Sequence, residues 1–560
     1  MENPKNKLSY ISVPSPIIHQ VPSSSLQGLL LSPKKSSRPR SRFLAAARNT
    51  GFLVFLCLFA FVGMLKLSVQ LDPLVPLAPI PCATPRPEAP PLFSSTAGDS
   101  QPATPPSGGG DGGGEEFWEQ PDGMGYRPCL DFSKGYRRAT EGIKRDRNKY
   151  LVVGVSGGLN QQRNQIVDAV VIARILGAAL VVPVLQVNIV WGDESEFGDI
   201  FDLEHFKRVL ANDVRVVSSL PTTHLTRRPV EQLPTPPRVS DRWIRSKYLK
   251  RLTREGVLVL RGFDSRLSKD LPSDLQKLRC KVPSLSLSLT YESSLTCVFL
   301  YSQVAFDALR FSAPVRELGN RLAMRMRSRG PYIALHLRME KDVWVRTGCF
   351  PGLSPEYDDV ISRERESRPE LLTGKTKMRH QERKAAGLCP LTIVEVTRLL
   401  KALGAPRRAN IFWAGGEPFG GGAALLPLVG EFPYLYNKYN LSSPGELDPF
   451  ANRSSILAAV DFIIAEKSDV FMPSHGGNMG RILKGHRAFA GHKKFITPNK
   501  RQMVPHFLNA SLPEAEFIQI IRELHNASLG QPELRTDKVG KDVTAYPIPE
   551  CMCNTTAPMP

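Results

Sequence analysis

The order of apolar and polar positions predicts a strand–helix–strand unit that begins at residue 150. Residues 150–155 form a continuous apolar run typical of a buried strand, and the turn Ser156-Gly157-Gly158 follows. Apolar residues then recur at helical spacing over 160–176, and Gly177 marks the end of that helix. A second strand is expected at 179–184, which implies a parallel sheet.

The same alternation recurs further along the chain. Strands are expected at 256–261, 332–338, 409–414 and 468–472, and helices at 391–403 and 453–467. We therefore predict an α/β fold with two halves, 146–330 and 331–510, and a C-terminal extension over 511–560. In such sheets, ligands bind beyond the carboxyl ends of the strands.

Residues 51–71 predict a transmembrane anchor. They are nearly all apolar, and a snorkelling Lys66 leaves enough length to span a bilayer. The flank just before the run holds six basic residues: Lys34, Lys35, Arg38, Arg40, Arg42 and Arg48. The positive-inside rule leaves residues 1–50 as a cytosolic tail and the rest in the lumen. A cleaved signal peptide and a buried core helix are the alternatives, and the long leader and the missing polar face disfavour them.

Residues 72–125 are rich in Pro, Ala, Ser and Gly, and include a glycine run at 108–114. This composition buries too little apolar surface to fold, so we expect a flexible stem. A short tail, one span, a stem and a large lumenal domain are typical of a single-pass type II Golgi membrane enzyme that modifies glycans.

Composition narrows the class of protein. The 560 residues are 42% hydrophobic and 22% charged, which are globular values, and the formal net charge is +20. The basic residues are dispersed, and the sequence carries none of the common nucleic-acid-binding motifs, so we expect no nucleic-acid partner. Part of the charge is consistent with a nucleotide-sugar or acidic-glycan site.

Eight of the nine cysteines follow the predicted span, and an even number there suits disulfides in an oxidising lumen. The spacing leaves their pairing open and does not suggest a zinc site. Five glycosylation sequons also suit the lumen, with acceptors at Asn440, Asn452, Asn509, Asn526 and Asn554.

The first candidate site is Gly157-Gly158-Leu159-Asn160-Gln161-Gln162, between a strand and a helix. Two glycines allow a close approach of a ligand to the backbone, and the helix N-terminus offers N–H donors to a phosphate. Asn160 is expected to cap that helix. An ordinary strand-to-helix turn explains the glycines equally well.

The second candidate is His336-Leu337-Arg338, at the end of a buried strand. Alternation places His336 and Arg338 on one face and Leu337 on the other. Arg suits bidentate contact with a diphosphate. The alternative is a structural ion pair with Glu340 or Asp342.

The third candidate runs from Asp461 to Arg487. It holds a strand, the loop Ser474-His475-Gly476-Gly477-Asn478, and a helix that carries Arg481, Lys484 and Arg487. The loop is suited to an anion by geometry, and the basic helix face could equally be a solvated surface. No Asp-x-Asp pair occurs in the sequence, so Arg338 and helix N-termini would have to neutralise a diphosphate, and we expect no metal.

These stretches resemble the plant O-fucosyltransferase-like family. SGGLNQQRNQIVDAVVIARILGAALVVPVL, EFGDIFDLEHF, IALHLRMEKDVWVRTGC, LCPLTIVEVTRLLKALG and SDVFMPSHGGNMGRILKGHR are similar to its blocks in order. The resemblance implies two Rossmann-like domains of GT-B type and an inverting, metal-independent transferase that uses GDP-fucose.

The resemblance also implies the donor-binding residues. These are Gly157, Gly158, Leu159, Asn160, Gln161, His336, Leu337, Arg338, Asp461, Ser474 and His475, with Arg338 stabilising the diphosphate as the catalytic residue. The acceptor would be a protein or glycan hydroxyl.

The sequence departs from the family in two places. Many members carry Tyr-Asp-Gly-Asn where this chain has Ser474-His475-Gly476-Gly477-Asn478, which leaves the sugar preference open. Some distant relatives have a glutamate base where this chain has Gly157, so Glu340 and Asp461 become candidate bases beside a water-relayed path. UDP-rhamnose-type transfer in cell-wall polysaccharide synthesis and a non-catalytic lumenal glycan-binding protein are the other functions that the sequence allows.

Overall fold

A computed structural model describes residues 113–120, 126–128, 130–187, 192–225, 230–231, 235–236, 238–262, 267–268, 271–281, 308–373, 377–489, 494–527 and 552–554. These residues all belong to one compact unit of the chain, which includes residues 111–560. The predicted tail, the predicted span at 51–71 and most of the stem lie outside the described residues. Within the described part, the helices are too short or too polar to cross a membrane.

The first half is built on a parallel sheet. Its strands are β2 (Tyr150–Val155), β3 (Ala179–Val181), β4 (Val184–Leu185), β5 (Val216–Val217), β6 (Val230–Glu231) and β7 (Val257–Arg261). Their order is β5-β3-β2-β7-β6, with β4 paired to the end of β2. Every pairing is parallel, as the strand–helix–strand pattern predicts.

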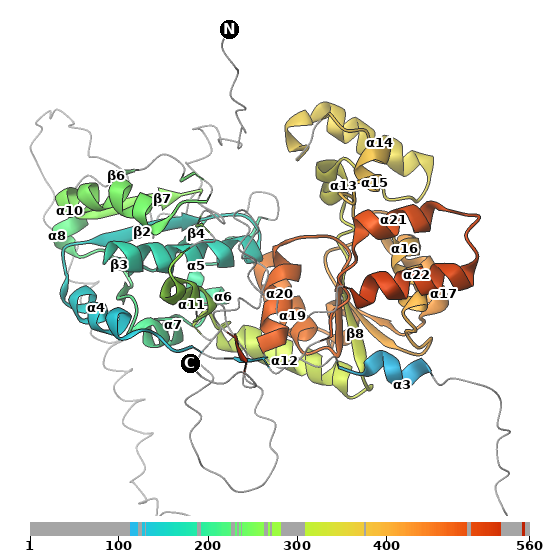
Figure 1. Ribbon diagram of the computed structural model, residues 1–560, viewed down its shortest axis with the longest axis horizontal. Helices are drawn as coiled ribbons and strands as arrows, with labels where there is room; N and C mark the ends of the chain where they lie inside the picture. Colours follow the sequence, from blue (N-terminus) through green and yellow to red (C-terminus); the bar gives the residue numbers. More distant parts are fainter. Residues whose placement is uncertain are drawn as a thin grey trace, which may run out of the picture. The chain divides into compact units, whose positions relative to one another are not determined.

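Helices surround this sheet (Figure 1). They are α4 (Lys134–Arg145), α5 (Leu159–Leu176), α6 (Phe197–Ile200), α7 (Leu203–Leu210), α8 (Thr222–Leu225), α9 (Asp241–Ile244), α10 (Lys250–Glu255) and α11 (Ser273–Lys281), with a π-helical turn at Arg245–Leu249. Helix α5 is buried on nearly all sides, which explains why its sequence is apolar beyond a single stripe.

The second half has its own parallel sheet, in the order β10-β9-β8-β11. Its strands are β8 (Tyr332–His336), β9 (Asn410–Ala414), β10 (Leu435–Tyr436) and β11 (Val470–Pro473). The helices of this half are α12 (Ala313–Arg327), α13 (Lys341–Thr347), α14 (Pro355–Ser367), α15 (His380–Ala385), α16 (Ile393–Ala402), α17 (Leu426–Glu431), α18 (Lys438–Leu441), α19 (Ser454–Glu466), α20 (Asn478–Phe489), α21 (Lys500–Leu508) and α22 (Glu514–Asn526). Helix α22 lies in the predicted C-terminal extension, and its Phe517 is buried against this half.

The side chains of β8 alternate between two hydrophobic cores. Ile333 and Leu335 belong to a core with α16 and α22, whereas Tyr332 and Ala334 belong to a core that also holds α12, α19 and α5. The predicted alternation of this strand is therefore confirmed. The second of these cores contains residues from both halves, so α12 and α19 are shared structural elements.

Some element boundaries differ from the predictions. The strand expected at 179–184 is divided into β3 and β4 around Val182 and Pro183. Pro183 has no N–H to donate, which interrupts the ladder. The structure also corrects the expected cap of α5: the helix begins at Leu159 with Gly158 in the capping position, and Asn160 already lies inside its first turn.

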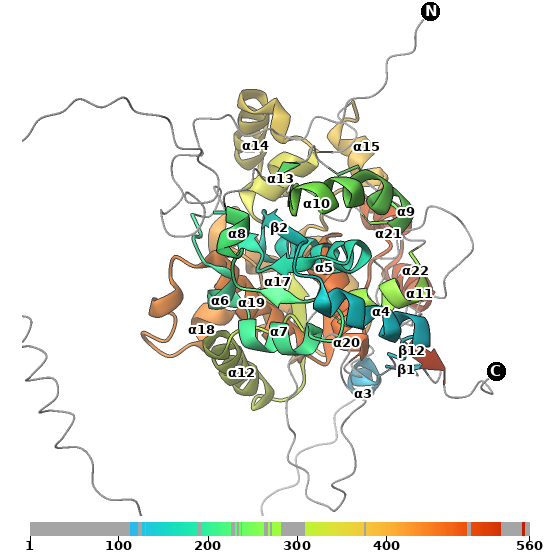
Figure 2. The same ribbon diagram turned by 90° about the vertical axis from the view of Figure 1, so that its left-hand side faces the viewer.

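A short helix, α3 (Gly113–Trp118), docks on the second half. It lies within the range whose composition predicts a stem, yet Phe117 is buried in the core with α16. Figures 1 and 2 show α3 at the end of this sheet opposite to α13–α15. Two further segments far apart in sequence pair as antiparallel strands, β1 (Tyr126–Pro128) and β12 (Met552–Asn554).

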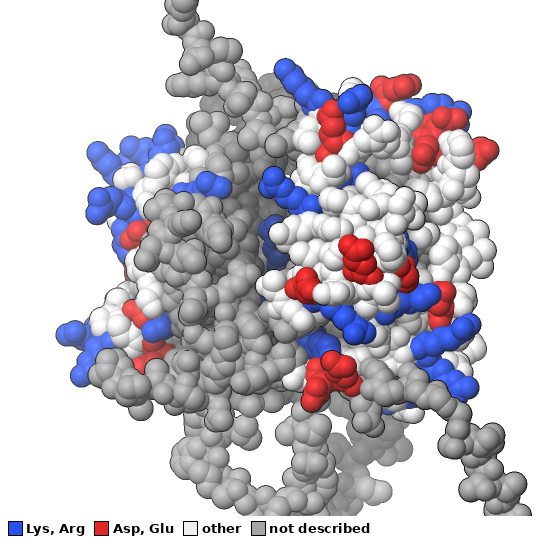
Figure 3. Space-filling view, turned by 45° about the vertical axis from the view of Figure 1, so that its right-hand side comes forward, with Lys and Arg blue, Asp and Glu red and all other residues white. Residues whose placement is uncertain are grey.

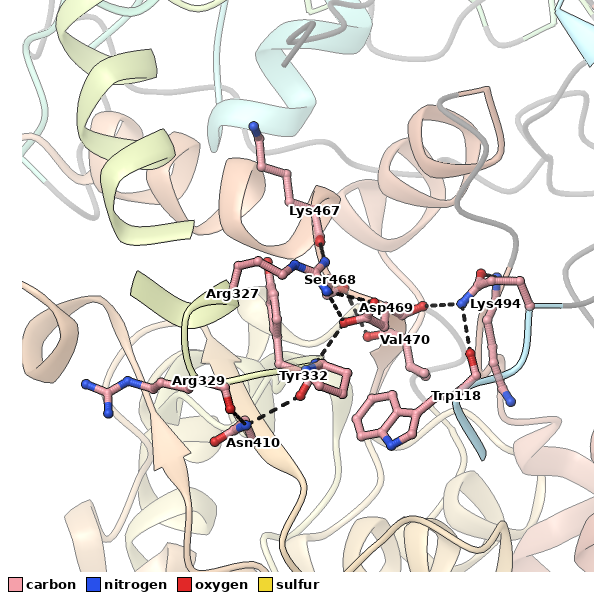
Figure 4. Close-up of polar contacts among 12 residues, drawn as sticks. Trp118, Arg327, Arg329, Tyr332, Asn410, Lys467, Ser468, Asp469, Val470 and Lys494 are labelled. Carbon is pink, nitrogen blue, oxygen red and sulfur yellow. Dashed lines mark hydrogen bonds and ion pairs between the residues drawn. The ribbon is translucent and has the colours of Figure 1, made fainter. Parts of the chain in front are cut away.

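Polar contacts fix the amino end of the second sheet, where Asp469 is the centre (Figure 4). Its Oδ2 accepts from the backbone N–H of Tyr332 at 2.8 Å and from Arg327 at 2.7 Å. Gln120, just after α3, donates to the Asp469 carbonyl at 3.2 Å and accepts from the N–H of Lys494 at 3.0 Å. Residues 113–120 are therefore held at this edge by both apolar and polar contacts.

Candidate functional site

Three strands of the second sheet end side by side. His336 of β8 pairs in register with Pro473 of β11 and with Ala414 of β9. The Ser474 N–H donates to the His336 carbonyl at 3.0 Å, and the Leu337 N–H donates to the Ala414 carbonyl at 3.2 Å. The segments that follow the three strands therefore meet at one carboxyl edge, where ligands bind in parallel sheets.

His336 is buried at this edge, and its Nδ1 has no hydrogen-bond partner among the described residues. Burial, with smaller contributions from the neighbouring Arg338 and His475, lowers the pKa of His336 to about 3. The imidazole is therefore neutral at physiological pH and presents an unsatisfied buried nitrogen. Such a group favours a ligand that completes its hydrogen bonding.

Arg338 lies next to it and is partly exposed. Its backbone N–H donates to Ser474 Oγ at 3.1 Å, and its Nε lies 3.4 Å from Glu340 Oε2. The structural ion pair that was the alternative interpretation is therefore present with Glu340, whereas Asp342 pairs with Arg346 at 3.5 Å. Within the described part of the chain, no hydrogen bond from the two terminal nitrogens of Arg338 is recorded, which leaves them available to an anion.

A loop with two consecutive glycines follows β9 at this edge. The sequence analysis did not identify it as part of the site. Gly415 has φ +153°, and a Cβ there would lie 2.8 Å from the Leu337 carbonyl oxygen. Its N–H donates to Asp461 Oδ2 at 3.2 Å, and the Gly416 N–H donates to Glu340 Oε1 at 3.1 Å. Two consecutive glycines directly after a predicted strand were the signal that could have identified it.

Asp461 is paired with Lys438, a residue that the sequence did not single out. The Lys438 Nζ lies 2.9 Å from Asp461 Oδ2 and donates to the Gly415 carbonyl at 2.9 Å. Burial favours the neutral amine, but the Asp461 carboxylate outweighs it and raises the pKa of Lys438. Both candidate bases, Asp461 and Glu340, thus already hold the glycine loop through one carboxylate oxygen.

Ser474 and His475 come from the loop that follows β11. Ser474 is fully buried and its carbonyl accepts from the Leu391 N–H at 3.0 Å. His475 Nδ1 lies 2.9 Å from the Nζ of Lys500. Burial lowers the pKa of His475 to about 3, with contributions from Lys500 and then Arg338.

The Gly157–Gly158 loop forms the equivalent turn in the first half, after β2. Gly157 has φ +89°, and a Cβ there would lie 2.2 Å from Gln161 Oε1. That oxygen accepts from the Gly158 N–H at 3.0 Å. Gln165, also missed from sequence, brackets Ser156: it accepts from the N–H at 3.2 Å and donates to the carbonyl at 2.8 Å.

Two of the predicted donor-binding residues turn their side chains away from these edges. Leu159 is buried in the core of α5, and Leu337 is buried beside Leu335 in the other core. Any contact of theirs with a ligand would come from the backbone. Asn160 Oδ1 and Gln162 Oε1 are buried without a partner among the described residues.

The structure therefore brings His336, Arg338, Asp461, Ser474 and His475 to one edge of the second sheet. The first glycine loop is linked to that half through α5, which packs on α20. Arg163 of α5 contacts His486 of α20 at 3.1 Å and lies over the Phe462 ring.

The basic face expected on α20 is only partly present. Arg481 is exposed, but Arg487 is fully buried and donates to the carbonyls of Ala465 and Ser468 at the end of α19. The expectation that Arg487 belongs to a surface or anion-binding face is therefore wrong. Unsatisfied carbonyls at a helix C-terminus attract cations, which explains its position.

Further observations bear on the compartment and on metals. Cys349 and Cys389 form a disulfide. Four sequon asparagines have exposed side chains: Asn440, Asn452, Asn509 and Asn526. The side chain of Asn554 lies outside the described part. Among the residues described, no group of three or more His, Cys, Asp or Glu side chains is arranged to hold a metal ion.

The sequence of this chain matches a family of known proteins. Residues 150–490 match the family described as GDP-fucose protein O-fucosyltransferase. The chain is 58% identical over 571 residues to O-fucosyltransferase 20 of Arabidopsis thaliana, covering 98% of this chain and 96% of that relative. It is 34% identical over 444 residues to O-fucosyltransferase 16 of the same plant, covering 79% and 72%.

The likeness to solved structures is weaker. POFUT1 in complex with GDP-fucose aligns with a TM-score of 0.38 and 13% identity, covering 63% of this chain and 98% of that one. POFUT1 in complex with GDP aligns with the same TM-score and 14% identity, covering 63% and 99%.

Proposed function

Because this chain belongs to the GDP-fucose protein O-fucosyltransferase family and is a glycosyltransferase, we propose that it transfers fucose from GDP-fucose to a protein or glycan hydroxyl. One observation carries the assignment of the site. At the carboxyl edge of β8, the Arg338 guanidinium lies beside the neutral His336, with donors available to an anion. A planar guanidinium matches the oxygens of a diphosphate bidentately.

In the proposed reaction the acceptor oxygen attacks the anomeric carbon on the face opposite the diphosphate. The bond between that carbon and the phosphate oxygen breaks, GDP leaves with the electron pair, and the anomeric configuration inverts. Arg338 stabilises the charge that develops on the leaving diphosphate, as a preorganised electrostatic donor does. The proposal assigns this task to Arg338 and helix N-termini, without a metal.

The hydroxyl proton must also leave. Asp461 Oδ2 accepts from Lys438 and from the Gly415 N–H, and Glu340 Oε1 accepts from the Gly416 N–H. Each carboxylate therefore already has one oxygen engaged by protein donors. This favours the transfer of the proton to water, with a transition state in which bond breaking is ahead of bond making.

The location is part of the same proposal. We place the enzyme in the Golgi membrane as a type II protein with its α/β halves in the lumen. The apolar run at 51–71 with its basic leading flank supports this topology. The Cys349–Cys389 disulfide supports an oxidising compartment.

A thermal-shift measurement tests the donor. The full chain, purified in detergent, is heated with GDP, UDP, GDP-fucose or UDP-rhamnose, each with and without EDTA. A ligand at 100 times its dissociation constant stabilises the folded state by about 2.7 kcal/mol. We expect selective shifts with GDP and GDP-fucose that EDTA does not change.

The other outcomes contradict specific parts of the proposal. A shift with UDP and UDP-rhamnose alone replaces fucose by a rhamnose-type donor. A shift that EDTA abolishes shows that a metal takes part. The absence of any shift, together with no release of GDP from GDP-fucose, overturns the assignment of this edge as a donor site.

A further inference from the structure

The side chain of Lys500 links three segments around the His475 loop. Lys500 is the first residue of α21, and its Nζ lies 2.9 Å from His475 Nδ1 and donates to the Cys389 carbonyl at 2.5 Å. Cys389 is tied to Cys349 by the disulfide, and Leu391 donates its N–H to the Ser474 carbonyl at 3.0 Å. A cross-linked segment thus supports both Lys500 and the loop that carries His475.

This contact determines how His475 can bind a ligand. The Lys500 Nζ contacts the ring at Nδ1, and the ring is also hydrogen-bonded to the Cys389 backbone carbonyl. The imidazole is neutral, because burial and the nearby cations lower its pKa to about 3. A neutral imidazole held by these two partners keeps one ring orientation at this edge.

We propose that Lys500 is a positioning residue for the donor diphosphate: it holds the His475 ring in place and adds a positive charge beside it. This inference rests on the proposed function, because it takes the His475 edge as the donor site. The Cys389 carbonyl, held by the disulfide, orients the ammonium toward the ring.

The charged groups around Lys500 make its contribution depend on pH. Lys384 of α15 repels it, and Glu395 of α16 attracts it, while Glu395 is itself paired with Lys384 at 2.5 Å. His475, from the loop after β11, is a further titratable group and contacts Lys500 directly. Burial, together with Lys384, lowers the pKa of Lys500 to about 8.

A bound diphosphate would raise that pKa again, because an opposite charge favours the ammonium. The contribution of Lys500 to binding is then complete below pH 8 and falls as pH rises from about 8 toward the pKa of the complex. Below pH 8 the affinity for GDP should therefore be independent of this group.

The test is the affinity for GDP, measured by calorimetry on the full chain between pH 7 and pH 9. For Lys500→Met we expect affinity about tenfold or more below that of the unmodified chain at pH 7, the value of one charge-assisted hydrogen bond. Between pH 8 and pH 9 the unmodified chain should lose affinity more steeply than Lys500→Met does. Lys500→Arg keeps the donor and the charge without titrating, so it should restore affinity at pH 7 and remove the difference in slope.

Lys494→Met is the matched control, because Lys494 is another partly buried lysine with a lowered pKa and lies near α3, at the opposite edge of the sheet. Its GDP affinity and pH profile should equal those of the unmodified chain.

Equal affinity and slope in Lys500→Met would overturn the inference while leaving the proposed function intact. If Lys500→Met does not fold, Lys500→Arg decides, and an unchanged alkaline slope in it would refute the inference. If the unmodified chain does not bind GDP, the proposed function fails first.

Discussion

Lys438 and Asp461 form an ion pair of 2.9 Å in which both side chains are almost completely buried, with 4% and 5% of their surface exposed. The pair has a local task, because Lys438 donates to the Gly415 carbonyl and Asp461 accepts from the Gly415 N–H. The ion pair thus holds both the backbone N–H and the backbone carbonyl of Gly415. The carboxyl edge of β9 depends on two charges that are almost completely shielded from water.

Removing one partner of this pair should be costly. Lys438→Met leaves the Asp461 carboxylate buried without its counter-ion, and we expect a loss of about 3–5 kcal/mol in the free energy of unfolding. Lys401→Met is the control, because Lys401 pairs with Glu431 on the surface, where such pairs contribute about 0–1 kcal/mol. Urea unfolding of both variants measures the difference. An equal loss of unfolding free energy in the two variants would contradict the large contribution expected of the buried pair.

Arg338 should matter for turnover rather than for stability. Arg338→Ala removes a donor aimed at the leaving diphosphate, and we expect kcat to fall about 10²–10³-fold, or about 2.7–4 kcal/mol. Arg379→Ala is the control, because Arg379 is highly exposed and pairs only with the surface residue Glu382 in the described structure. Release of GDP from GDP-fucose with acceptor measures the rate, and an Arg338→Ala enzyme with unchanged kcat refutes this role.

The parts of the fold that the sequence predicted are those with strong periodicity. The run at β2, the helix α5 and the alternation of β8 each carry their signal within one segment. The predicted site residues His336 and Arg338 lie at the end of β8, so they could be located from the strand alone. Local pattern was sufficient there because burial of a strand or helix dictates the type of residue at each position.

The unpredicted features depend on contacts between distant segments. The Gly415–Asp461 and Gly416–Glu340 hydrogen bonds join residues 46 and 76 positions apart. Arg487 stands on a helix whose sequence is polar, and only the carbonyls at the end of α19 explain why it is buried. Figure 3 shows acidic and basic side chains intermixed over the face that it presents, so a high net charge does not mark one patch there.

A buried carboxyl group should make stability depend on pH. Glu466 of α19 lies 3.3 Å from His486, with Arg163, Lys467 and Arg487 also acting on it. Burial raises its pKa to about 7, from an ordinary value of 4.5. Between these values the folded state keeps the proton and the unfolded state releases it, so this group lowers stability as pH rises.

Glu466→Gln isolates this effect, because the amide keeps the shape without titrating. We expect the stability of the variant relative to the unmodified chain to increase from pH 4.5 to pH 7, by about 3 kcal/mol at most, and then to stay level. Thermal unfolding across this range measures the difference. His486 is present in both proteins, so its titration does not affect the comparison. If the stability difference between the variant and the unmodified chain does not change from pH 4.5 to pH 7, Glu466 is ionised over this whole range.

The docking of α3 predicts that residues 113–120 contribute to the stability of the second half. Phe117 has 4% of its surface exposed and is buried in the core with α16, while the Lys494 Nζ lies 5.2 Å from the centre of its ring. Truncating a well-packed aromatic residue costs about 3–5 kcal/mol, so Phe117→Ala should lower the free energy of unfolding by that amount.

Leu508→Ala is the matched control for Phe117→Ala, because Leu508 is an apolar side chain with 63% of its surface exposed. Its substitution should change the free energy of unfolding by about 0.5 kcal/mol or less. Chemical denaturation of the full chain compares the two variants.

A chain that begins at residue 126 should lose at least as much stability as Phe117→Ala, because it lacks Phe117 and also the hydrogen bonds of Gln120 to Asp469 and Lys494. Equal stability of the shortened and the full chain would mean that residues 113–120 belong to the stem alone.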